Sequence, residues 1–359
     1  MADNKDKKVL KVPDLRFPEF TGEWQCKAIG KVAPLQRGFD LPTQNLVEGI
    51  YPVIYSNGIL QHHDKYKCEA PGLITGRSGT IGKFTYIDSG FYWPHNTSLW
   101  VTDFCGNCPK FIYYLYQTVH IEQFSTGSGV PTLNRNDVHR YKTFVPTAIV
   151  EQEKIAKFLS ILDERIATQN KIIEDLKKLK SAIIEKLYSE IQGKEYSFGQ
   201  LFEVVNERNK QMEYSNILSA SQEKGMVNRD DLNLDIQFER SNINTYKIVM
   251  AGDYVIHLRS FQGGFAFADK LGVCSPAYTI LRPNSLLEYG YLSYYFTSNR
   301  FIKSLIIVTY GIRDGRSINV EEWLNMKIAI PSKGQQFHIL KVLKSIDDKI
   351  ENEEIYATC

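Results

Sequence analysis

The sequence predicts an α+β protein in which two copies of a mixed α and β domain are separated by long helices, with the second helix short. Two observations support this prediction: residues 151–192 carry a helical apolar stripe, and residues 335–354 repeat its opening half. The predicted parts are a first domain at 1–150, a long helix at 151–193, a second domain at 194–334 and a second helix at 335–359.

The first long helix has the pattern of a coiled-coil strand. No glycine or proline occurs from Glu151 to Gln192, and Gly193 then supplies a stop. At 1.5 Å per residue, such a helix is about 60 Å long. Its apolar residues recur at steps of three and four, and the stripe is broken only by Gln169 and Lys180. They are Ile155, Leu159, Leu162, Ile166, Ile173, Leu176, Ile183 and Leu187. One exposed stripe of this length needs a partner helix, from this chain or from another.

The chain contains a candidate for that partner. Ile339, Leu343, Ile346 and Ile350 repeat the first four apolar residues of the stripe, each displaced by 184 positions. Each copy follows a segment that ends in a proline, Pro146 or Pro331, and we expect a strand there. Solenoid repeats have periods of about 20 to 50 residues, so this longer period indicates a duplicated architecture.

The second copy of the helix is the shorter one. A helix as long as the first would run beyond Cys359. Either the second helix is naturally short, or this is a truncated or rearranged copy. In the second case, we expect the far half of the first helix to lack an intramolecular partner. On this hypothesis Leu176, Ile183 and Leu187 pair with another chain.

Short apolar segments separated by Gly, Pro and Asn predict strands and turns in both domains. Residues 109–123 and 289–307 have helical spacing of aromatic residues, and we expect one helix at each. The hydrophobic content of 43% is ordinary for a soluble protein, and no apolar run approaches membrane-spanning length. Six cysteines and a charged N-terminal segment without an apolar core predict a reducing cytoplasm. The net charge of +2 does not by itself indicate nucleic acid.

Motifs that suggest catalysis or metal binding fail on their spacing. Residues 76–83, GRSGTIGK, have the wrong glycine spacing for a phosphate loop, which favours a strand, a turn and a strand. Cys105 and Cys108 have zinc-ligand spacing but no second pair, which favours a tight turn with two free thiols. His62, His63 and Asp64 cannot all converge if they lie on a strand, so we expect a solvated polar turn. The sequence predicts no catalytic centre.

Two kinds of loop have side chains suited to polyanions and base edges, and both kinds occur in each half. The first kind is GRSGTIGK (76–83) and HLRSFQGG (257–264), and the second kind, just before the closing strand, is 125–137 and 309–319. Arginine and lysine contact phosphates or guanine, Ser, Asn and Gln contact phosphates or bases, and glycine allows close approach. Taken singly, such loops are more often exposed turns with solvated arginines, but their recurrence favours binding. The candidates are Arg77, Ser78, Lys83 and Arg135 in the first half, and Arg259, Ser260, Gln262, Arg313 and Arg316 in the second.

The chain as a whole resembles the specificity subunits of type I restriction-modification systems. The resemblance rests on LRFPEFTGEW (15–24), on GSGVPTLNRNDVHRYKTFVP (127–146) followed by EQEKIAKFLSILDERI (151–166), and on the weaker repeat of both before the C-terminus. It implies two target-recognition domains, each contacting half of a split DNA sequence. It also implies that the two long helices pair as an antiparallel coiled coil that sets the spacing between the half-sites.

The partners and cofactors follow from the resemblance alone. It implies double-stranded DNA, two methylation subunits docked on the helices, and restriction subunits, with no membrane. This chain would bind no cofactor. S-adenosylmethionine would belong to the methylation subunit, which modifies adenine, and Mg and ATP to the restriction subunit, which cuts unmethylated DNA.

Two alternatives remain open. One is a non-enzymatic coiled-coil scaffold, whose aromatic protein interfaces would depend less on salt than phosphate contacts do. The other is an autonomous nuclease or methyltransferase, which the missing catalytic motifs disfavour.

Overall fold

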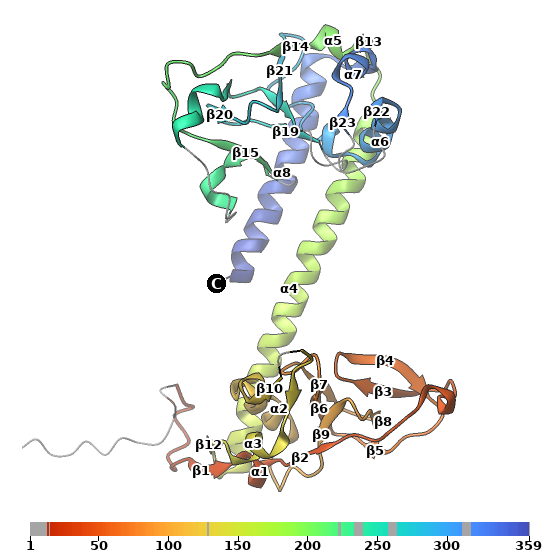
Figure 1. Ribbon diagram of the computed structural model, residues 1–359, viewed down its shortest axis with the longest axis vertical. Helices are drawn as coiled ribbons and strands as arrows, with labels where there is room; N and C mark the ends of the chain where they lie inside the picture. The colour runs from red at the N-terminus through yellow and green to blue at the C-terminus, as the bar shows by residue number, and fades with distance from the viewer. Residues whose placement is uncertain are drawn as a thin grey trace, which may run out of the picture. The chain divides into compact units, whose positions relative to one another are not determined.

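The computed structural model describes residues 13, 15–127, 129–221, 224–232, 240–257, 264–310 and 317–358. The chain divides into two compact units, Met1–Ile166 and Ala167–Cys359. The boundary falls inside the long helix α4, Ile149–Ser189. Figure 1 labels the elements.

The first unit contains two four-stranded sheets. One has the order β2-β9-β6-β7 and is antiparallel throughout. The other has the order β4-β3-β8-β5, with β3 and β8 parallel. The pairs β1-β12 and β10-β11 complete the unit. The strands are β1 Gln25–Ala28, β2 Leu35–Arg37, β3 Tyr51–Tyr55, β4 Gly58–His63, β5 Cys68–Glu69, β6 Gly72–Gly76, β7 Phe84–Ile87, β8 Phe91–Pro94, β9 Ser98–Val101, β10 Ser125–Thr126, β11 Thr132–Leu133 and β12 Lys142–Val145.

The helices of the first unit lie against the first of these sheets. They are α1 Ile29–Val32, α2 Pro109–Thr118, α3 Arg135–Arg140 and the beginning of α4, with 3-10 turns at Thr43–Asn45 and Ile121–Phe124. Their core residues include Ile29, Ile112, Tyr116, Val138 and Ala156, which pack with Leu73 and Leu99 of the sheet. The spacing of the aromatics on α2 therefore reflects core packing, as expected for residues 109–123, although the α-helix itself ends at Thr118.

The second unit repeats this plan. Its four-stranded sheet has the order β14-β21-β18-β19, and the pairs β13-β24, β15-β16, β17-β20 and β22-β23 surround it. The strands are β13 Lys194–Ser197, β14 Phe202–Val205, β15 Leu218–Ser221, β16 Gly225–Asn228, β17 Lys247–Val249, β18 Tyr254–Ile256, β19 Phe265–Phe267, β20 Gly272–Cys274, β21 Thr279–Pro283, β22 Thr309–Tyr310, β23 Ser317–Ile318 and β24 Lys327–Ile330. The helices are α5 Phe198–Leu201, α6 Asn299–Ser304, α7 Val320–Asn325 and α8 Lys333–Thr358, with 3-10 turns at Arg229–Leu232, Arg240–Thr245, Tyr295–Thr297 and Leu305–Val308.

The predicted duplication is confirmed down to single side chains. Asn134 and Asn319 cap α3 and α7, each accepting a hydrogen bond from a backbone N–H of the helix's first turn. Gln152 and Gln336 are both buried at the start of a long helix. Each donates to the carbonyl of the preceding proline, Pro146 or Pro331. Equivalent polar residues thus anchor each long helix to its own unit.

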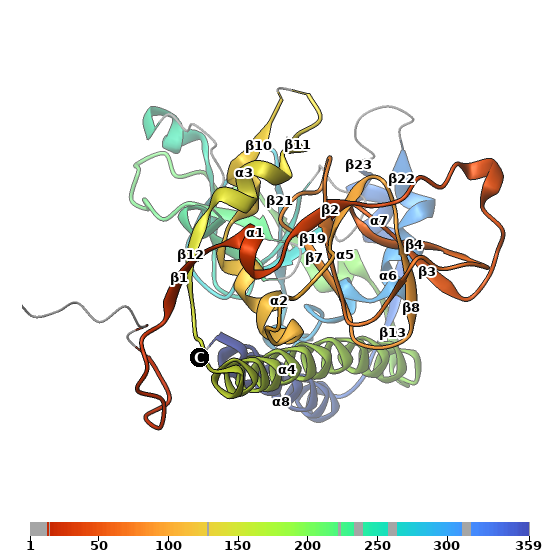
Figure 2. The same ribbon diagram turned by 90° about the horizontal axis from the view of Figure 1, so that it is seen from below.

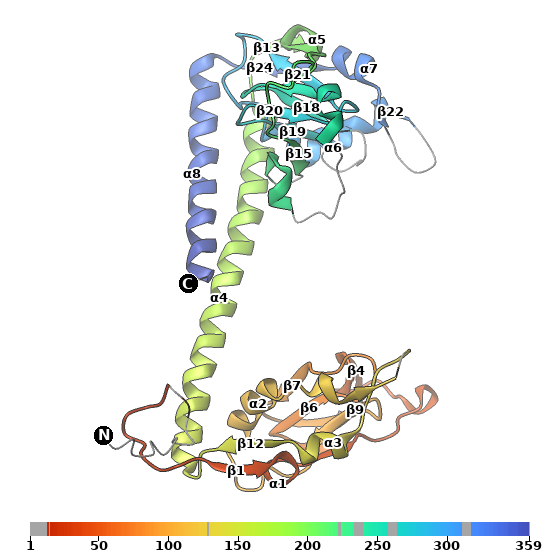
Figure 3. The ribbon, with the colours of Figure 1, turned by 60° about the vertical axis from the view of Figure 1, so that its left-hand side comes forward.

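The two long helices run antiparallel, as the resemblance implied, and α8 is the shorter, with 26 residues against 41 for α4. Gln169 donates to the Glu353 carboxylate at 2.6 Å, and Lys180 pairs with Asp347. Because residue numbers rise along α4 as they fall along α8, the directions are opposite. Figure 3 shows α8 alongside the second half of α4, and Figure 2 shows the two helices next to each other from a second direction.

The expectation about the uncovered half of the helix is wrong. An antiparallel α8 covers the far half of α4, so Ile183 and Leu187 pack on the core that contains Ile339 and Leu343, and Leu176 is half-buried. The bare segment lies in the near half, where Leu162 and Ile166 are exposed. The prediction is wrong because it assigned to α8 the part of α4 that α8 repeats in sequence. Antiparallel helices pair in opposite directions, so α8 lies along the other half.

Three local predictions also need correction. The segments 132–146 and 317–331 are not single strands. Each begins with a two-residue strand, β11 or β23, continues as a short capped helix, α3 or α7, and ends with β12 or β24. The second aromatic segment, residues 289–307, is not one helix. The backbone of Ser298 is extended, and its hydroxyl caps α6 by accepting a hydrogen bond from the Phe301 N–H. His63 is buried at the end of β4, where its Nδ1 lies 3.0 Å from the Val47 carbonyl oxygen, so it belongs to no solvated turn. Its neighbour His62 is exposed, as alternation along a strand requires.

Candidate nucleic-acid interface

The interface in the first unit begins at the tight loop between β6 and β7. Residues 76–83 connect β6 to β7, so the segment is a strand, a turn and a strand, as expected, and no phosphate loop. A Cβ on Gly76 would lie 1.7 Å from the Thr80 carbonyl oxygen, so only glycine allows the loop to fold back this closely. The backbone of the next residue, Arg77, is held on both sides. Its N–H donates a hydrogen bond to the Thr97 carbonyl, and its carbonyl accepts one from the Leu133 N–H. The backbone from which the Arg77 side chain extends therefore has a fixed position.

The second predicted loop, between β10 and β11, meets the first. Ser78 forms a β-bridge with Thr132, and the Gly79 N–H donates to the Pro131 carbonyl at 3.0 Å. These bonds join two segments that lie more than 50 residues apart in the sequence. The sequence predicted both loops as binding elements, and the structure brings them together at one edge of the unit.

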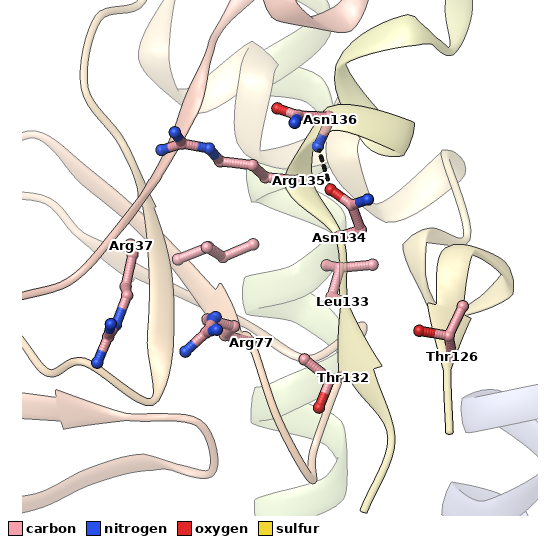
Figure 4. Close-up of a pocket in the computed structure, with 9 residues that line it drawn as sticks. Arg37, Arg77, Thr126, Thr132, Leu133, Asn134, Arg135 and Asn136 are labelled. Atoms are coloured by element: carbon pink, nitrogen blue, oxygen red, sulfur yellow. Dashed lines mark hydrogen bonds between the residues drawn. The ribbon is translucent and has the colours of Figure 1, made fainter. Parts of the chain in front are cut away.

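A cleft of about 410 Å³ opens where these segments meet. Figure 4 shows Arg37 from β2, Arg77 after β6 and Arg135 from α3 around this cleft. The remaining lining residues are small, apolar or amide-bearing: Leu99, Thr126, Thr132, Leu133, Asn134 and Asn136. Among the described lining residues there is no carboxylate, so the cleft is positively charged and rich in hydrogen-bonding groups.

The three arginines differ in how they are held. Arg37 pairs with Asp40 at 3.2 Å and donates from Nε to the Asn96 carbonyl at 3.4 Å. Within the described part of the chain, neither Arg77 nor Arg135 forms an ion pair with a carboxylate. Their positive charge is therefore available to an external anion, whereas part of the Arg37 charge is already compensated.

A half-buried imidazole positions the third side of the cleft. His139 of α3 accepts a hydrogen bond at its Nε2 from the Leu35 N–H, at 2.8 Å. Burial, and then the nearby charge of Arg135, lower the pKa of His139. The imidazole is therefore neutral and able to accept, and it ties α3, which carries Arg135, to β2, which carries Arg37.

The DNA-binding residues predicted from the sequence of the first unit lie in three kinds of place. Arg77 and Arg135 line the cleft, and Ser78 lies beside it in the bridge to Thr132. Lys83 is exposed but does not line the cleft. Sequence reasoning missed Arg37, Thr126, Asn134 and Asn136, although Thr126, Asn134 and Asn136 lie in the predicted loop 125–137. Arg37 carries no local signal, because strand pairing with β9 alone places it near the cleft.

The candidates of the second unit, Arg259, Ser260, Gln262, Arg313 and Arg316, lie outside the described residues. The described strands on either side of them match the first unit. The hairpin β18-β19 occupies the sheet position of β6-β7, and the pair β22-β23 occupies that of β10-β11. The loops that carry these five residues therefore connect equivalent strands, as their sequence positions predicted.

The remaining motifs have local roles. Cys105 and Cys108 stand in the tight turn that precedes α2, and both thiols are free, as expected. Across the residues that the structure describes, no group of three or more His, Cys, Asp or Glu side chains could hold a metal ion. No helix within the same residues is both long and apolar enough to cross a membrane.

Two solved structures from type I restriction-modification systems share this architecture. The S subunit of the type I restriction-modification system from M. genitalium matches with a TM-score of 0.59 at 15% identity, over 94% of this chain and 92% of that one. A chain from a structure of the type I system's complex assembly and conformational transition matches with a TM-score of 0.57 at 13% identity, over 93% of each chain. At these identities the likeness shows the fold: the chain has the specificity-subunit fold, with a duplicated mixed α/β unit and two long helices.

The sequence matches the family described as the type I restriction modification DNA specificity domain over residues 21–178 and 192–357, and the chain belongs to this family. Two relatives come from Methanocaldococcus jannaschii. The type I restriction enzyme MjaVIII specificity subunit is 27% identical over 281 residues, which cover 67% of this chain and 64% of the relative. The putative MjaX specificity subunit is 25% identical over 265 residues, which cover 67% and 62%. The chain thus spans slightly less than two thirds of the length of these relatives.

Proposed function

We propose that the chain is the sequence-specific DNA-binding subunit of a type I restriction-modification complex, with each unit contacting one half of a bipartite target. The observation that carries the proposal is the cleft of the first unit. There, two loops predicted independently from the sequence converge with three arginines and no described carboxylate. The family match over both units and the equivalent loop positions in the second unit support the same role there.

The chemistry of the cleft suits groove contacts. Arginine can bind guanine bidentately or hold a phosphate, and asparagine can bind adenine or a phosphate. Threonine methyl groups can contact thymine. Arg77 and Arg135 are free to make such contacts, while the backbone bonds of Arg77 keep its position fixed. If one of them binds guanine, its removal costs about 1 to 3 kcal/mol at one base position; if it holds a phosphate, all sequences weaken alike.

The same proposal includes the partners. The chain would act without catalysing a reaction, in the cytoplasm, with two methylation subunits docked on the long helices and restriction subunits joining them. It would bind no cofactor itself; S-adenosylmethionine would be held by the methylation subunit, and Mg and ATP by the restriction subunit. The family membership supports the assembly, and the antiparallel pairing of α4 and α8 supports the spacer role of the helices.

The first test is sequencing for methylated adenine in cells that carry this chain with a cognate methylation subunit, against cells that lack only this chain. We expect a split motif, two short defined halves around a fixed gap, which appears only with the chain. An absence of new methylation while both proteins are soluble and associated contradicts the proposal.

The second test is DNA binding by the purified complex to that target. Arg77→Ala and Arg135→Ala are each expected to weaken binding about tenfold or more, in line with 1 to 3 kcal/mol. Arg140→Ala is the matched control, because Arg140 lies on the same helix as Arg135 but is already paired with Asp137. If the substituted arginine holds a phosphate, the slope of log affinity against log salt should fall by about 0.9. DNA binding that does not depend on salt and does not weaken when either arginine is replaced would favour the scaffold alternative.

A further inference from the structure

The backbone at Arg37 has a fixed position in the first unit. Arg37 is the last residue of β2 and pairs with Leu99 of β9. The N–H of the next residue, Gly38, donates a hydrogen bond to the Ser98 carbonyl at 3.0 Å. A Cβ on Gly38 would lie 2.2 Å from the His95 carbonyl oxygen, so only glycine allows this close approach of the two segments. The Arg37 side chain therefore reaches the cleft from a rigid base.

Two acceptors hold one edge of the Arg37 guanidinium. Its Nε donates to the Asn96 carbonyl at 3.4 Å, and its Nη2 donates to the Asp40 carboxylate at 3.2 Å. The Asn96 side-chain amide donates to the same carboxylate oxygen, so Asp40 is itself held in place. Nε and Nη2 lie on one edge of the planar guanidinium group. These contacts therefore orient the Arg37 side chain as well as compensating part of its charge.

A second edge of the guanidinium, formed by Nη1 and Nη2, remains available. A guanidinium group has five N–H donors in a fixed planar geometry. The contacts with Asn96 and Asp40 use two of them, and within the described part of the chain no hydrogen bond involves the Arg37 Nη1. The Arg37 side chain is 50% exposed. Two parallel N–H groups, one from each terminal nitrogen, can therefore bind one external pair of acceptors.

The surroundings of Arg37 favour a base over a phosphate as that pair of acceptors. The Asp40 side chain is 70% exposed, so its negative charge lies beside Arg37 at the surface. This charge repels a nearby phosphate, whereas guanine is uncharged and presents O6 and N7 side by side in the major groove. A guanidinium that is already oriented also loses less conformational entropy on binding. Arg77 and Arg135 differ, because neither pairs with a described carboxylate.

We propose that Arg37 binds a guanine in the half-site of the first unit, and that Asp40 is the positioning residue that orients Arg37. The assignment rests on the proposed function and adds to it a base and a division of roles. It requires a G·C pair in that half-site. It also gives Asp40 an effect that charge alone does not explain. Removing a carboxylate beside a polyanion site strengthens binding to every sequence, whereas removing a positioning residue weakens the discrimination between bases.

The test uses the full chain in complex with a cognate methylation subunit, the target found by methylated-adenine sequencing, and duplexes in which each base pair of the target is replaced in turn. Binding is followed by fluorescence anisotropy of the labelled duplex. Arg37→Ala should weaken binding to the target about tenfold or more and abolish the preference for guanine at one position. Duplexes already substituted at that position should be affected much less. Arg37→Lys keeps the charge but not the planar pair of donors, so it should lose the same preference.

A second variant, Asp40→Ala, separates orientation from charge. It should reduce the preference for guanine at the same position, and in the Arg37→Ala background it should change that preference no further. Asp137→Ala is the matched control. Asp137 pairs with an arginine three residues away, as Asp40 does, but its partner Arg140 does not line the cleft. The control should therefore affect all duplexes alike.

Three results would each overturn the assignment: equal weakening of all duplexes by Arg37→Ala, no loss of preference at any G·C position in that variant, or an unchanged preference in Asp40→Ala. The proposed function survives such a result if Arg77→Ala and Arg135→Ala still weaken binding to the target. A complex with no sequence preference at all contradicts both the assignment and the proposed function.

Discussion

Replacing the buried glutamine at the start of either long helix tests the duplicated anchoring of these helices. The Gln152 amide donates to Pro146 and Asn107 and accepts from the Cys108 N–H, each at 2.9 Å. Its side chain is 2% exposed. Gln152→Ala removes all three hydrogen bonds and leaves their partners without a replacement in the protein.

The magnitude follows from those three bonds. A typical intramolecular hydrogen bond contributes about 1 kcal/mol net, so the loss is about 3 kcal/mol. Since about 1.4 kcal/mol corresponds to a factor of ten, the open fraction of the first unit should rise about 100-fold. Gln336 has a matching set of partners, the Glu288 N–H and the carbonyls of Leu286 and Pro331. Gln336→Ala should therefore cost about the same in the second unit.

Hydrogen exchange measured by mass spectrometry suits this test, because a chain with two units has no single unfolding free energy. Gln152→Ala should accelerate exchange in α2 and β6, and Gln336→Ala in β18 and β21. Gln117→Ala is the control, because Gln117 is an exposed glutamine on α2 and should change stability by less than about 0.5 kcal/mol. Losses below about 1 kcal/mol for both buried glutamines would refute the anchoring argument.

Three further predictions concern charge, backbone and packing. Burial alone would raise the pKa of Glu151, but hydrogen bonds from Arg16 and Trp24 and the Arg16 charge outweigh it and hold the pKa below its usual value. The pair therefore stabilises the first unit above the ordinary glutamate pKa of about 4.3, and this stability is lost as the pH falls through the lower folded pKa. In pH-dependent denaturation, the difference between wild type and Glu151→Gln should shrink towards acid; a constant difference contradicts the linkage. Gly76→Ala should displace Arg77 and weaken DNA binding at least as much as Arg77→Ala, since a Cβ would meet the Thr80 carbonyl; unchanged affinity in a gel-shift titration would show that the loop adapts. Leu343→Ala removes a fully buried side chain and should cost about 2 to 5 kcal/mol in urea unfolding of the second unit, whereas a cost below 1 kcal/mol would mean that α8 is loosely packed.

The local sequence pattern was sufficient to predict the two long helices and the duplication. The stripe on α4 and its shorter copy on α8 are visible because helical side chains repeat every 3.6 residues, whatever they pack against. The two arginine loops were found because glycine and polar residues mark sharp turns near binding groups. The turn that places Cys105 and Cys108 before α2 followed from the same reasoning.

Other features did not follow from the periodicity of the sequence. Residues 289–307 have a helical pattern, yet Ser298 divides them, because capping a new helix competes locally with continuing the old one. His63 stands among residues typical of a turn, but in the structure the Val47 carbonyl, 16 positions away, lies against its ring. That partner cannot be inferred from local composition.

The sequence alone determined that this protein has two similar units with a long helix after each, because periodicity and repetition are properties of the linear chain. Only the tertiary structure decided that Arg37 joins Arg77 and Arg135, since strand pairing across more than 60 residues brings β2 beside β9. It also decided which half of α4 stays bare. The stripe pattern is the same on both helices, and the antiparallel direction of α8, set by packing in the second unit, determines that Ile183 is covered while Ile166 remains exposed.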